Sequence, residues 1–325
     1  MSTIKVAIIQ LHPQPHQTES NQARGIAFIR EAARTGANLA VLPEYHMGDF
    51  FPEDPKFRDQ CANWKQYLDV YCDLAKECNI CIVPGSAAEL YRDENTGEET
   101  IFNVVYFIDN TGAIAGRYEK KNLWHPERPH VKGSQQDPHI AFDTPLGKVG
   151  MLICWDVAFP EAFRELISQG AKLIIVPSFW KLTDCAPLGL VHNRYAEKVF
   201  LDAALISRAC ENTCAVVFCN AGGPAEEDFA GLSQVTVPFL GCIGRAETCE
   251  ETMKIIDLDM RILDDAESVY KVRQDMGRHD WHYAYRSSYI SPDLAAQLNG
   301  TYERPYLSTP AVDLIDPVKV ELMAS

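Results

Sequence analysis

The stretch GANLAVLPE, residues 36–44, is repeated in outline by GAKLIIVPS, residues 170–178. Each copy lies at the end of a helix-then-strand unit, runs through apolar and β-branched residues, and ends with a proline and a polar residue. An apolar run of this length before a turn is typical of a buried strand in an α/β fold. We therefore expect two stacked mixed sheets related by rough symmetry, with helices outside, which is a four-layer α-β-β-α sandwich.

Outward from these two copies, short apolar runs alternate with helical patterns along most of the chain. The predicted strands are residues 5–10, 39–44, 80–85, 100–109, 113–119, 148–156, 173–178, 215–220, 231–237 and 253–258. Turn sequences at 109–112 and 145–147 predict hairpins, so both parallel and antiparallel pairs are expected. Helix stripes that should face a sheet are Cys61, Trp64, Leu68, Tyr71, Ala75 and Cys78, and then Ala196, Val199, Phe200, Ala203 and Ala204.

The composition places the chain among globular proteins and limits its partners. Of its 325 residues 46% are hydrophobic and 23% charged, which excludes disordered, collagen-like and disulfide-scaffold classes. Thirty basic against 45 acidic residues give a net charge of −15, which disfavours a nucleic-acid partner. Because no Pro/Gly/Ser-rich linker divides the chain, we expect one domain over residues 1–275 and a C-terminal extension, 276–325, that docks on the body or on a neighbouring subunit.

The sequence shows neither a secretion signal nor a run of about 18 apolar residues, so we expect a cytoplasmic protein without a membrane partner. Its eleven cysteines should then remain mostly reduced. Cys78 and Cys81 form a C-x-x-C pair, but no second pair accompanies them, and they join a helix end to a strand. We therefore expect no metal and no cofactor.

Three residues stand where catalytic chemistry is plausible. Cys154 follows the apolar run 149–153 and precedes a helix start at Pro160, and a thiol at such a strand-to-helix turn suits a nucleophile. Glu44 ends its strand beside an apolar run, where partial burial would favour a general base, although a solvated loop carboxylate fits equally well. Lys120 ends the run RYEKK, residues 117–121, where paired lysines are more often surface charge.

Taken together, these residues and their neighbours resemble the nitrilase superfamily of carbon-nitrogen hydrolases. The resemblance rests on LPE at 42–44, YEK at 118–120, CWD at 154–156 and FPE at 159–161. Supporting similarities are IIVPS at 174–178, SRACEN at 207–212 and the strand that ends at Asn220. The similarity extends from residue 4 to about 275, and the family fold is the α-β-β-α sandwich.

The resemblance implies a role for each residue. Cys154 would be the nucleophile, Glu44 the base that takes its proton, and Lys120 the cation that stabilises the oxyanion, with Lys121 as the alternative lysine. Glu127 would be a second glutamate that positions substrate or water, although its loop departs from the commoner family pattern. The pocket would draw on aromatic and imidazole side chains that would also suit core packing, namely Tyr45, His125, Trp155, Phe179 and Trp180.

Cys-Trp-Asp followed by Phe-Pro-Glu resembles the amidase and carbamoylase branches rather than the nitrile-hydrolysing one. The resemblance therefore implies hydrolysis of a small linear amide or N-carbamoyl compound through a cysteine thioester, with release of ammonia or an amine and an acid. The alternatives are a nitrilase, an acyltransferase that uses the same thioester, and a catalytically silent binding protein on this scaffold. The resemblance also implies a homodimer or a larger homo-oligomer.

Overall fold

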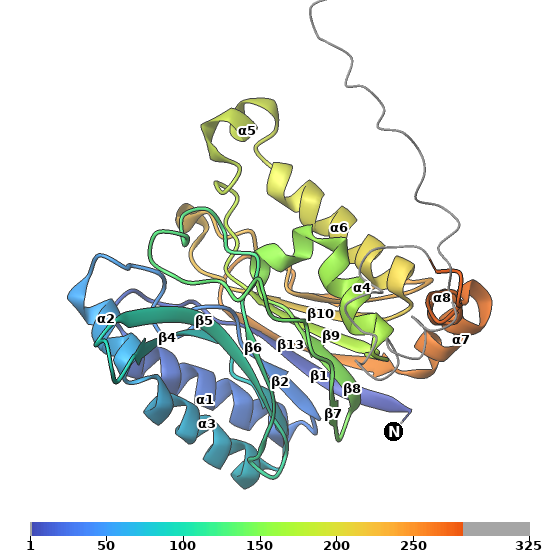
Figure 1. The fold of residues 1–325 in the computed structure, drawn as a ribbon, viewed down its shortest axis with the longest axis horizontal. Helices are drawn as coiled ribbons and strands as arrows, with labels where there is room; N and C mark the ends of the chain where they lie inside the picture. The colour runs from blue at the N-terminus through green and yellow to red at the C-terminus, as the bar shows by residue number, and fades with distance from the viewer. Residues whose placement is uncertain (1, 282–325) are drawn as a thin grey trace, which may run out of the picture. The chain divides into compact units, whose positions relative to one another are not determined.

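Two mixed β-sheets lie face to face in the computed structural model, which describes residues 2–281 (Figure 1). The first sheet has the strand order β13-β1-β2-β3-β5-β4, with β6 also paired to β5. The second has the order β12-β11-β10-β9-β8-β7. The strands are β1 (Thr3–Gln10), β2 (Leu39–Val41), β3 (Cys81–Val83), β4 (Ser86–Arg92), β5 (Glu99–Ile108), β6 (Ile114–Glu119), β7 (Phe142–Thr144), β8 (Gly147–Met151), β9 (Leu173–Ser178), β10 (Ala215–Asn220), β11 (Gln234–Val237), β12 (Gly241–Arg245) and β13 (Thr252–Asp259).

The two sheets are built alike. In the first, β1, β2 and β3 run parallel; in the second, β8, β9 and β10 do. Antiparallel strands flank each trio, β13 and β5 in the first sheet, β7 and β11 in the second. The repeated stretches supply β2 and β9, the middle strand of each trio. The repeat in the sequence therefore corresponds to a repeat in the topology.

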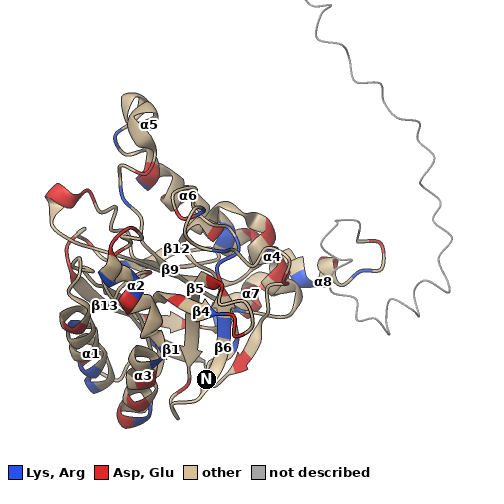
Figure 2. Cartoon of the chain, turned by 60° about the vertical axis from the view of Figure 1, so that its left-hand side comes forward, with Lys and Arg blue, Asp and Glu red and all other residues tan. Residues whose placement is uncertain are grey.

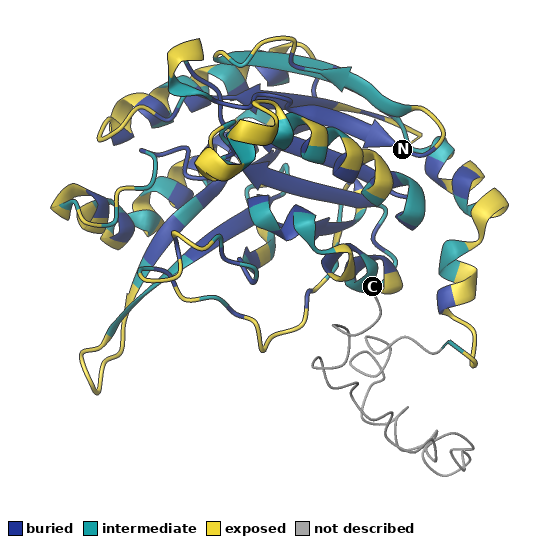
Figure 3. Ribbon diagram, turned by 90° about the horizontal axis from the view of Figure 1, so that it is seen from above, coloured by how far each residue is buried: buried dark blue, intermediate teal, exposed yellow. Residues whose placement is uncertain are grey.

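Helices cover the outer faces of both sheets (Figures 1 and 3). On the first sheet, α1 and α3 pack through a buried cluster that includes Ile29, Leu68, Tyr71 and Leu74. On the second sheet, α6 contacts β10 and β11, and α4 packs beside α6. The helices are α1 (Thr18–Arg34), α2 (Pro55–Ala62), α3 (Trp64–Cys78), α4 (Pro160–Ser168), α5 (Ala186–His192), α6 (Ala196–Asn212), α7 (Arg261–Tyr270) and α8 (Val272–Met276), with short 3-10 helices η1 (Cys154–Ala158) and η2 (Ala225–Glu227).

The four-layer sandwich predicted from the sequence is confirmed, with local differences. The strand expected over 148–156 ends at Met151, because Cys154 takes a left-handed conformation with φ 47° that no strand accommodates. The stripe from Cys61 to Cys78 spans two helices, divided at Asn63. In α6, Val199 and Ala203 face outward, whereas Leu201, Ala204, Leu205 and Ala209 are buried.

Acidic and basic residues are interspersed on the outer helices, as Figure 2 shows. Arg30 of α1 and Glu77 of α3 form an ion pair across the two helices, with guanidinium and carboxylate groups both half exposed. Such pairs contribute about 0 to 1 kcal/mol each, so the apolar cluster beneath them supplies most of the packing free energy.

The described residues contain no helix that is both long and apolar enough to cross a bilayer. All eleven cysteines are free thiols. The expected docking of the extension concerns mainly residues 282–325, which lie outside the described residues. The boundary at residue 275 and the cytoplasmic location stay predictions.

Candidate active site

Glu44 lies where the first sheet meets the second. The N–H of Leu42 still donates to the Val83 carbonyl oxygen, but Pro43 has no N–H with which to continue the ladder. The Glu44 N–H donates instead to the carbonyl oxygen of Ser178 in β9, at 3.3 Å. The chain approaches so closely here that a Cβ on Gly85 would lie 1.9 Å from the Pro43 carbonyl oxygen. These contacts bury Glu44 at the junction of the two sheets, with 1% of its surface exposed.

Cys154 is the first residue of η1, at the tight turn that follows β8. Its left-handed φ of 47° is uncommon for a residue with a side chain and is held by the surrounding turn. Asp156 stabilises that turn, because its Oδ2 accepts the N–H of Ile153 at 2.9 Å. The Cys154 Sγ lies 3.7 Å from the Phe179 carbonyl oxygen and donates to it. The thiol is therefore buried and fixed in place.

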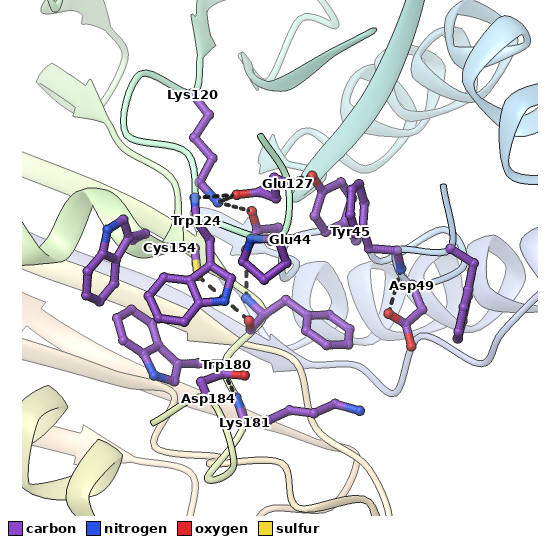
Figure 4. Close-up of a pocket in the computed structure, with 15 residues that line it drawn as sticks. Glu44, Tyr45, Asp49, Lys120, Trp124, Glu127, Cys154, Trp180, Lys181 and Asp184 are labelled. Atoms are coloured by element: carbon purple, nitrogen blue, oxygen red, sulfur yellow. Dashed lines mark hydrogen bonds and ion pairs between the residues drawn. The ribbon is translucent and has the colours of Figure 1, made fainter. Parts of the chain in front are cut away.

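Lys120 follows β6 and is almost completely enclosed, with 1% exposure. Its Nζ donates to Glu44 Oε1 at 2.9 Å and to Glu127 Oε2 at 2.6 Å. One ammonium group thus bridges two buried carboxylates (Figure 4). A buried lysine retains its charge only when such partners offset the loss of hydration.

The Glu127 carboxylate accepts hydrogen bonds from several further groups. Tyr45 OH donates to its Oε1 at 2.6 Å, and the Trp124 N–H donates to its Oε2 at 2.8 Å. The amide of Asn103 bridges the two acids, since its Nδ2 lies 3.1 Å from Glu127 Oε1 and 2.8 Å from Glu44 Oε1. A carboxylate with this many donors is stabilised in its ionised form.

The proton affinities of the four groups diverge. Burial raises the pKa of Glu44, and the nearby Lys120 only partly opposes the rise. Burial would also raise the pKa of Glu127, but the Lys120 ion pair outweighs it and holds that pKa below its usual value. Burial would lower the pKa of Lys120, yet the two carboxylates keep it well above its ordinary value. Burial, reinforced by the charge of Glu44, places the pKa of the Cys154 thiol well above its usual range. The resting site therefore holds a neutral thiol, a charged Lys120, an ionised Glu127 and, in Glu44, the carboxylate with the higher proton affinity.

These groups form the floor of a pocket of about 320 Å³, a volume that fits a small organic molecule. Its walls are largely aromatic, and two acids and one further lysine line the same space. The aromatic wall residues are Tyr45, Phe50, Phe51, Trp124, Trp155, Phe179 and Trp180, and the charged ones are Asp49, Lys181 and Asp184 (Figure 4).

The structure brings most of the residues expected from the sequence to this pocket. Glu44, Lys120, Glu127 and Cys154 all line it, as do four of the five expected binding residues. His125 does not; it is exposed, and its ring lies against that of Trp124 at an interplanar angle of 46°, with ring centroids 4.2 Å apart. Trp124 lines the pocket instead. Lys121 turns away from the two acids, because its Nζ donates to the Ser134 carbonyl oxygen and Oγ, each at 3.1 Å.

Sequence reasoning missed several residues of the site. Asn103 lies within a predicted strand, and nothing in its local sequence marks it as the amide between two acids. Lys181 and Asp184 lie in the segment that follows the repeated stretch 170–178. Ligand sites in α/β folds form at the ends of central strands, so the position of this segment is a signal that could have predicted both residues. Among the described residues no group of three or more His, Cys, Asp or Glu side chains could hold a metal ion.

Several solved structures share this α-β-β-α architecture. A carbon-nitrogen hydrolase from Helicobacter pylori matches with a TM-score of 0.72, over 86% of this chain and 96% of that one, at 20% identity. An amidase from Nesterenkonia matches with a TM-score of 0.65, over 85% of this chain and 94% of that one, at 21% identity. In that amidase the acetamide moiety of fluoroacetamide is attached to the active-site cysteine. At sequence identities of 20 and 21%, these matches show that the fold is shared and nothing more.

Sequence similarity identifies the family. The carbon-nitrogen hydrolase family model matches residues 5–267. Human omega-amidase is 28% identical over 81% of this chain and 91% of its own length. Deaminated glutathione amidase from Bos taurus is 31% identical over 74% of this chain and 72% of its own. The protein belongs to the carbon-nitrogen hydrolase family and is a hydrolase of the nitrilase superfamily.

Proposed function

We propose that this hydrolase cleaves a small linear amide or N-carbamoyl compound through a thioester on Cys154. The observation that carries the proposal is the buried Lys120 ammonium, shared by Glu44 and Glu127 beside a neutral thiol at the pocket floor. Relatives named as amidases support an amide as the substrate. Other relatives at similar identity are named as nitrilases, so a nitrile is the alternative substrate.

In the first half-reaction, Cys154 Sγ attacks the amide carbon while Glu44 takes the thiol proton. Glu44 suits this step because burial raises its pKa toward that of a useful base. The carbonyl oxygen becomes an oxyanion, which Lys120 and the N–H of Trp155 stabilise. The C–N bond then breaks, and the protonated Glu44 gives its proton to the departing amine or ammonia.

In the second half-reaction, water attacks the thioester carbon and Glu44 accepts a proton from it. The second tetrahedral oxyanion collapses, the C–S bond breaks, and the proton returns from Glu44 to the cysteine sulfur as the acid leaves. Glu127 stays ionised throughout, keeps Lys120 charged and positions it. The enclosed aromatic walls limit the access of other nucleophiles to the thioester.

The test combines variants with paired substrates. Parent, Cys154→Ala and Glu44→Gln proteins are incubated with amides, N-carbamoyl amino acids and nitriles, and ammonia release is measured. We expect turnover of amide or carbamoyl compounds by the parent, none by Cys154→Ala, and a loss of about 10²-fold or more in Glu44→Gln. Activity of Cys154→Ala within about tenfold of the parent would reject the covalent mechanism.

We further infer that the protein assembles as a homodimer through α5 and α6. Leu188 and Val191 of α5 are each 83% exposed, and Val199 of α6 is 60% exposed. Figure 1 shows α5 projecting from the body next to the start of α6. Exposed apolar side chains clustered on neighbouring helices are typical of a protein interface, and a two-fold pair would cover the same face on both subunits.

A further inference from the structure

The outer part of the pocket presents aromatic faces to whatever enters it. Trp155 lies between Trp124 and Trp180, with ring centroids 4.6 and 5.7 Å away respectively. Trp180 is held from behind, because its Nε1 donates to Glu197 Oε2 at 2.6 Å. Aromatic faces carry partial negative charge and attract cations, and they repel anions for the same reason.

Two carboxylates, those of Asp49 and Asp184, line the same space. Asp184 Oδ2 accepts the N–H of Lys181 at 2.8 Å, and Asp49 Oδ1 accepts the N–H of Phe50. Within residues 2–281 neither acid has an ion-pair partner, and the second oxygen of each accepts no hydrogen bond from the protein. Burial raises the pKa of Asp184 to about 6 and also raises that of Asp49. Both acids are therefore held in a partly dry site where a bound cation would stabilise their ionised forms.

Besides Lys120, the described residues place one further lysine in the pocket, Lys181, whose positive charge lowers the pKa of Asp49 and of Asp184 without cancelling the effect of burial. Among the described residues its ammonium forms no ion pair with either acid and lies instead over two aromatic rings. Its Nζ lies 4.6 Å from the centre of the Phe229 ring and 5.4 Å from that of Phe179. Figure 4 shows Asp184 on the opposite side of Cys154 from the stem of Lys120. Apart from Glu44, Glu127 and Lys120, the pocket is therefore lined by two carboxylates and one ammonium group. A further carboxylate, that of Glu197, lies behind the Trp180 side chain.

We propose that the substrate carries a cationic group, such as a primary ammonium, at the end remote from the scissile amide, and that Asp184 binds it against the Trp180 face. This inference rests on the proposed function and adds the substrate class to it. The ammonium would donate to the unpartnered oxygen of Asp184 while its methylene chain lies along the tryptophans. An anionic end would meet aromatic faces and two carboxylates and would have only Lys181 to favour it.

Three amides of similar length test the charge preference: 5-aminopentanamide, hexanamide and the monoamide of adipic acid. We expect kcat/KM for the ammonium compound to exceed that for hexanamide by about tenfold or more, the scale of one charge-assisted hydrogen bond, with the carboxylate compound lowest. Binding of the same compounds to Cys154→Ala, measured by calorimetry, should follow the same order without any turnover.

Variants assign the preference to a residue. Asp184→Asn keeps an oxygen for the Lys181 N–H, and we expect it to reduce the ammonium-to-methyl ratio to near one. Asp73→Asn, at an exposed position of α3, is the matched control and should leave the ratio unchanged. Lys181→Met should preserve or raise the ammonium preference.

The outcomes separate the two proposals. Absence of ammonia release from every amide and carbamoyl compound tested would count against the proposed function, whereas hydrolysis without charge preference would overturn the cationic substrate alone. A preference for the carboxylate compound that disappears in Lys181→Met would also overturn it and make Lys181 the anchor of an anionic group. Equal binding of all three compounds to Cys154→Ala overturns it even if none is hydrolysed.

Discussion

Glu44 and Glu127 accept hydrogen bonds from the same ammonium, yet their surroundings shift their pKa values in opposite directions. Glu127 receives further bonds from Tyr45 and Trp124, which hold it ionised. Glu44 accepts the N–H of Phe179 at 2.9 Å, and burial dominates its proton affinity. One lysine cannot fully neutralise two dry carboxylates, so the excess negative charge favours proton uptake. The charge of Glu44 acts more strongly on the Cys154 thiol than that of Glu127 does, so Glu44 is the group suited to take that proton.

The two adjacent lysines provide an internal comparison at the residue scale. We expect Lys120→Met to lower kcat by about 10²-fold or more, with a smaller change in KM, because it removes charge stabilisation that is strongest in the transition state. Lys120→Arg should not restore activity, since a planar guanidinium does not replace a compact ammonium between two acids. Steady-state kinetics measures both effects, and thermal unfolding shows whether each variant is folded.

Lys121→Met is the matched control, because it removes a neighbouring buried ammonium that donates to Ser134 and lies 5.5 Å from the centre of the Tyr118 ring, away from the two acids. It should retain most of the parent kcat. If Lys121→Met were inactive and Lys120→Met near normal, the oxyanion role would belong to Lys121.

The sequence contained enough information to bring Glu44, Lys120 and Cys154 forward together, because each stands near the end of a strand in a recognisable motif. It did not contain the Asn103 bridge or the outward turn of His125. Both depend on how β5 and the loop after β6 fold over the pocket. The positions of the motifs thus indicate which residues could react. The residues that hydrogen-bond to them, such as Asn103, depend on packing between segments that are distant in the chain.

At the scale of elements, the site forms because strand ends from both sheets converge. Glu44 comes from the end of β2, Lys120 from the end of β6, and Cys154 from the turn after β8. Asp156 joins two of these segments, since its Oδ2 accepts from Tyr118 OH at 2.8 Å and its Oδ1 from the Asn122 N–H at 3.1 Å. The lysine segment and the cysteine turn are therefore held in one hydrogen-bonded unit.

Two of the three strands that were not predicted, β4 and β12, show what the local sequence pattern lacks; the third is the short β7. The sequence of β4, SAAELYR, is rich in helix-favouring residues, yet it pairs along its whole length with β5. In β12, GCIGR, two glycines weaken the strand signal, and pairing with β11 compensates. Both segments form strands because of the strands they pair with, and the spacing of apolar residues within the segment itself does not predict this pairing.

The segment after β2 is attached to α3 by a buried histidine, and this gives a pH dependence to stability. His46 Nε2 lies 2.9 Å from Tyr71 OH, and burial lowers the pKa of His46 to about 3. An unfolded histidine has a pKa near 6.5, so below that pH the unfolded chain binds a proton that the folded protein does not. The free energy of unfolding should therefore fall by about 1.4 kcal/mol per pH unit as pH drops from about 6.5.

Urea denaturation of the parent and His46→Gln at pH 7 and pH 5 measures this contribution. The parent should lose about 2 kcal/mol more than the variant between the two pH values, since other titrating groups are common to both. Equal losses would mean that His46 is protonated, or rehydrated, in the folded protein.

For the whole molecule, a dimer would do more than cover apolar surface. α5 begins at Ala186, directly after the segment that brings Lys181 and Asp184 to the pocket. A second subunit packed on Leu188 and Val191 would restrict that segment from outside. Assembly and the shape of the outer pocket should therefore be coupled through one short stretch of chain.

Val191→Asp tests this coupling. In a two-fold interface the substitution places two carboxylates against the same apolar contact, and their desolvation and mutual repulsion oppose association. Sedimentation should give about twice the chain mass of 36.4 kDa for the parent and a shift toward that mass for the variant. Val70→Asp, at an exposed position of α3, which packs on the other sheet, is the control and should sediment like the parent.

Because α5 is continuous with the Asp184 segment, the Val191→Asp monomer should also show a raised KM with a smaller change in kcat. A parent that sediments as a monomer at micromolar concentration would contradict the dimer, and a monomeric variant with unchanged KM would contradict the coupling alone.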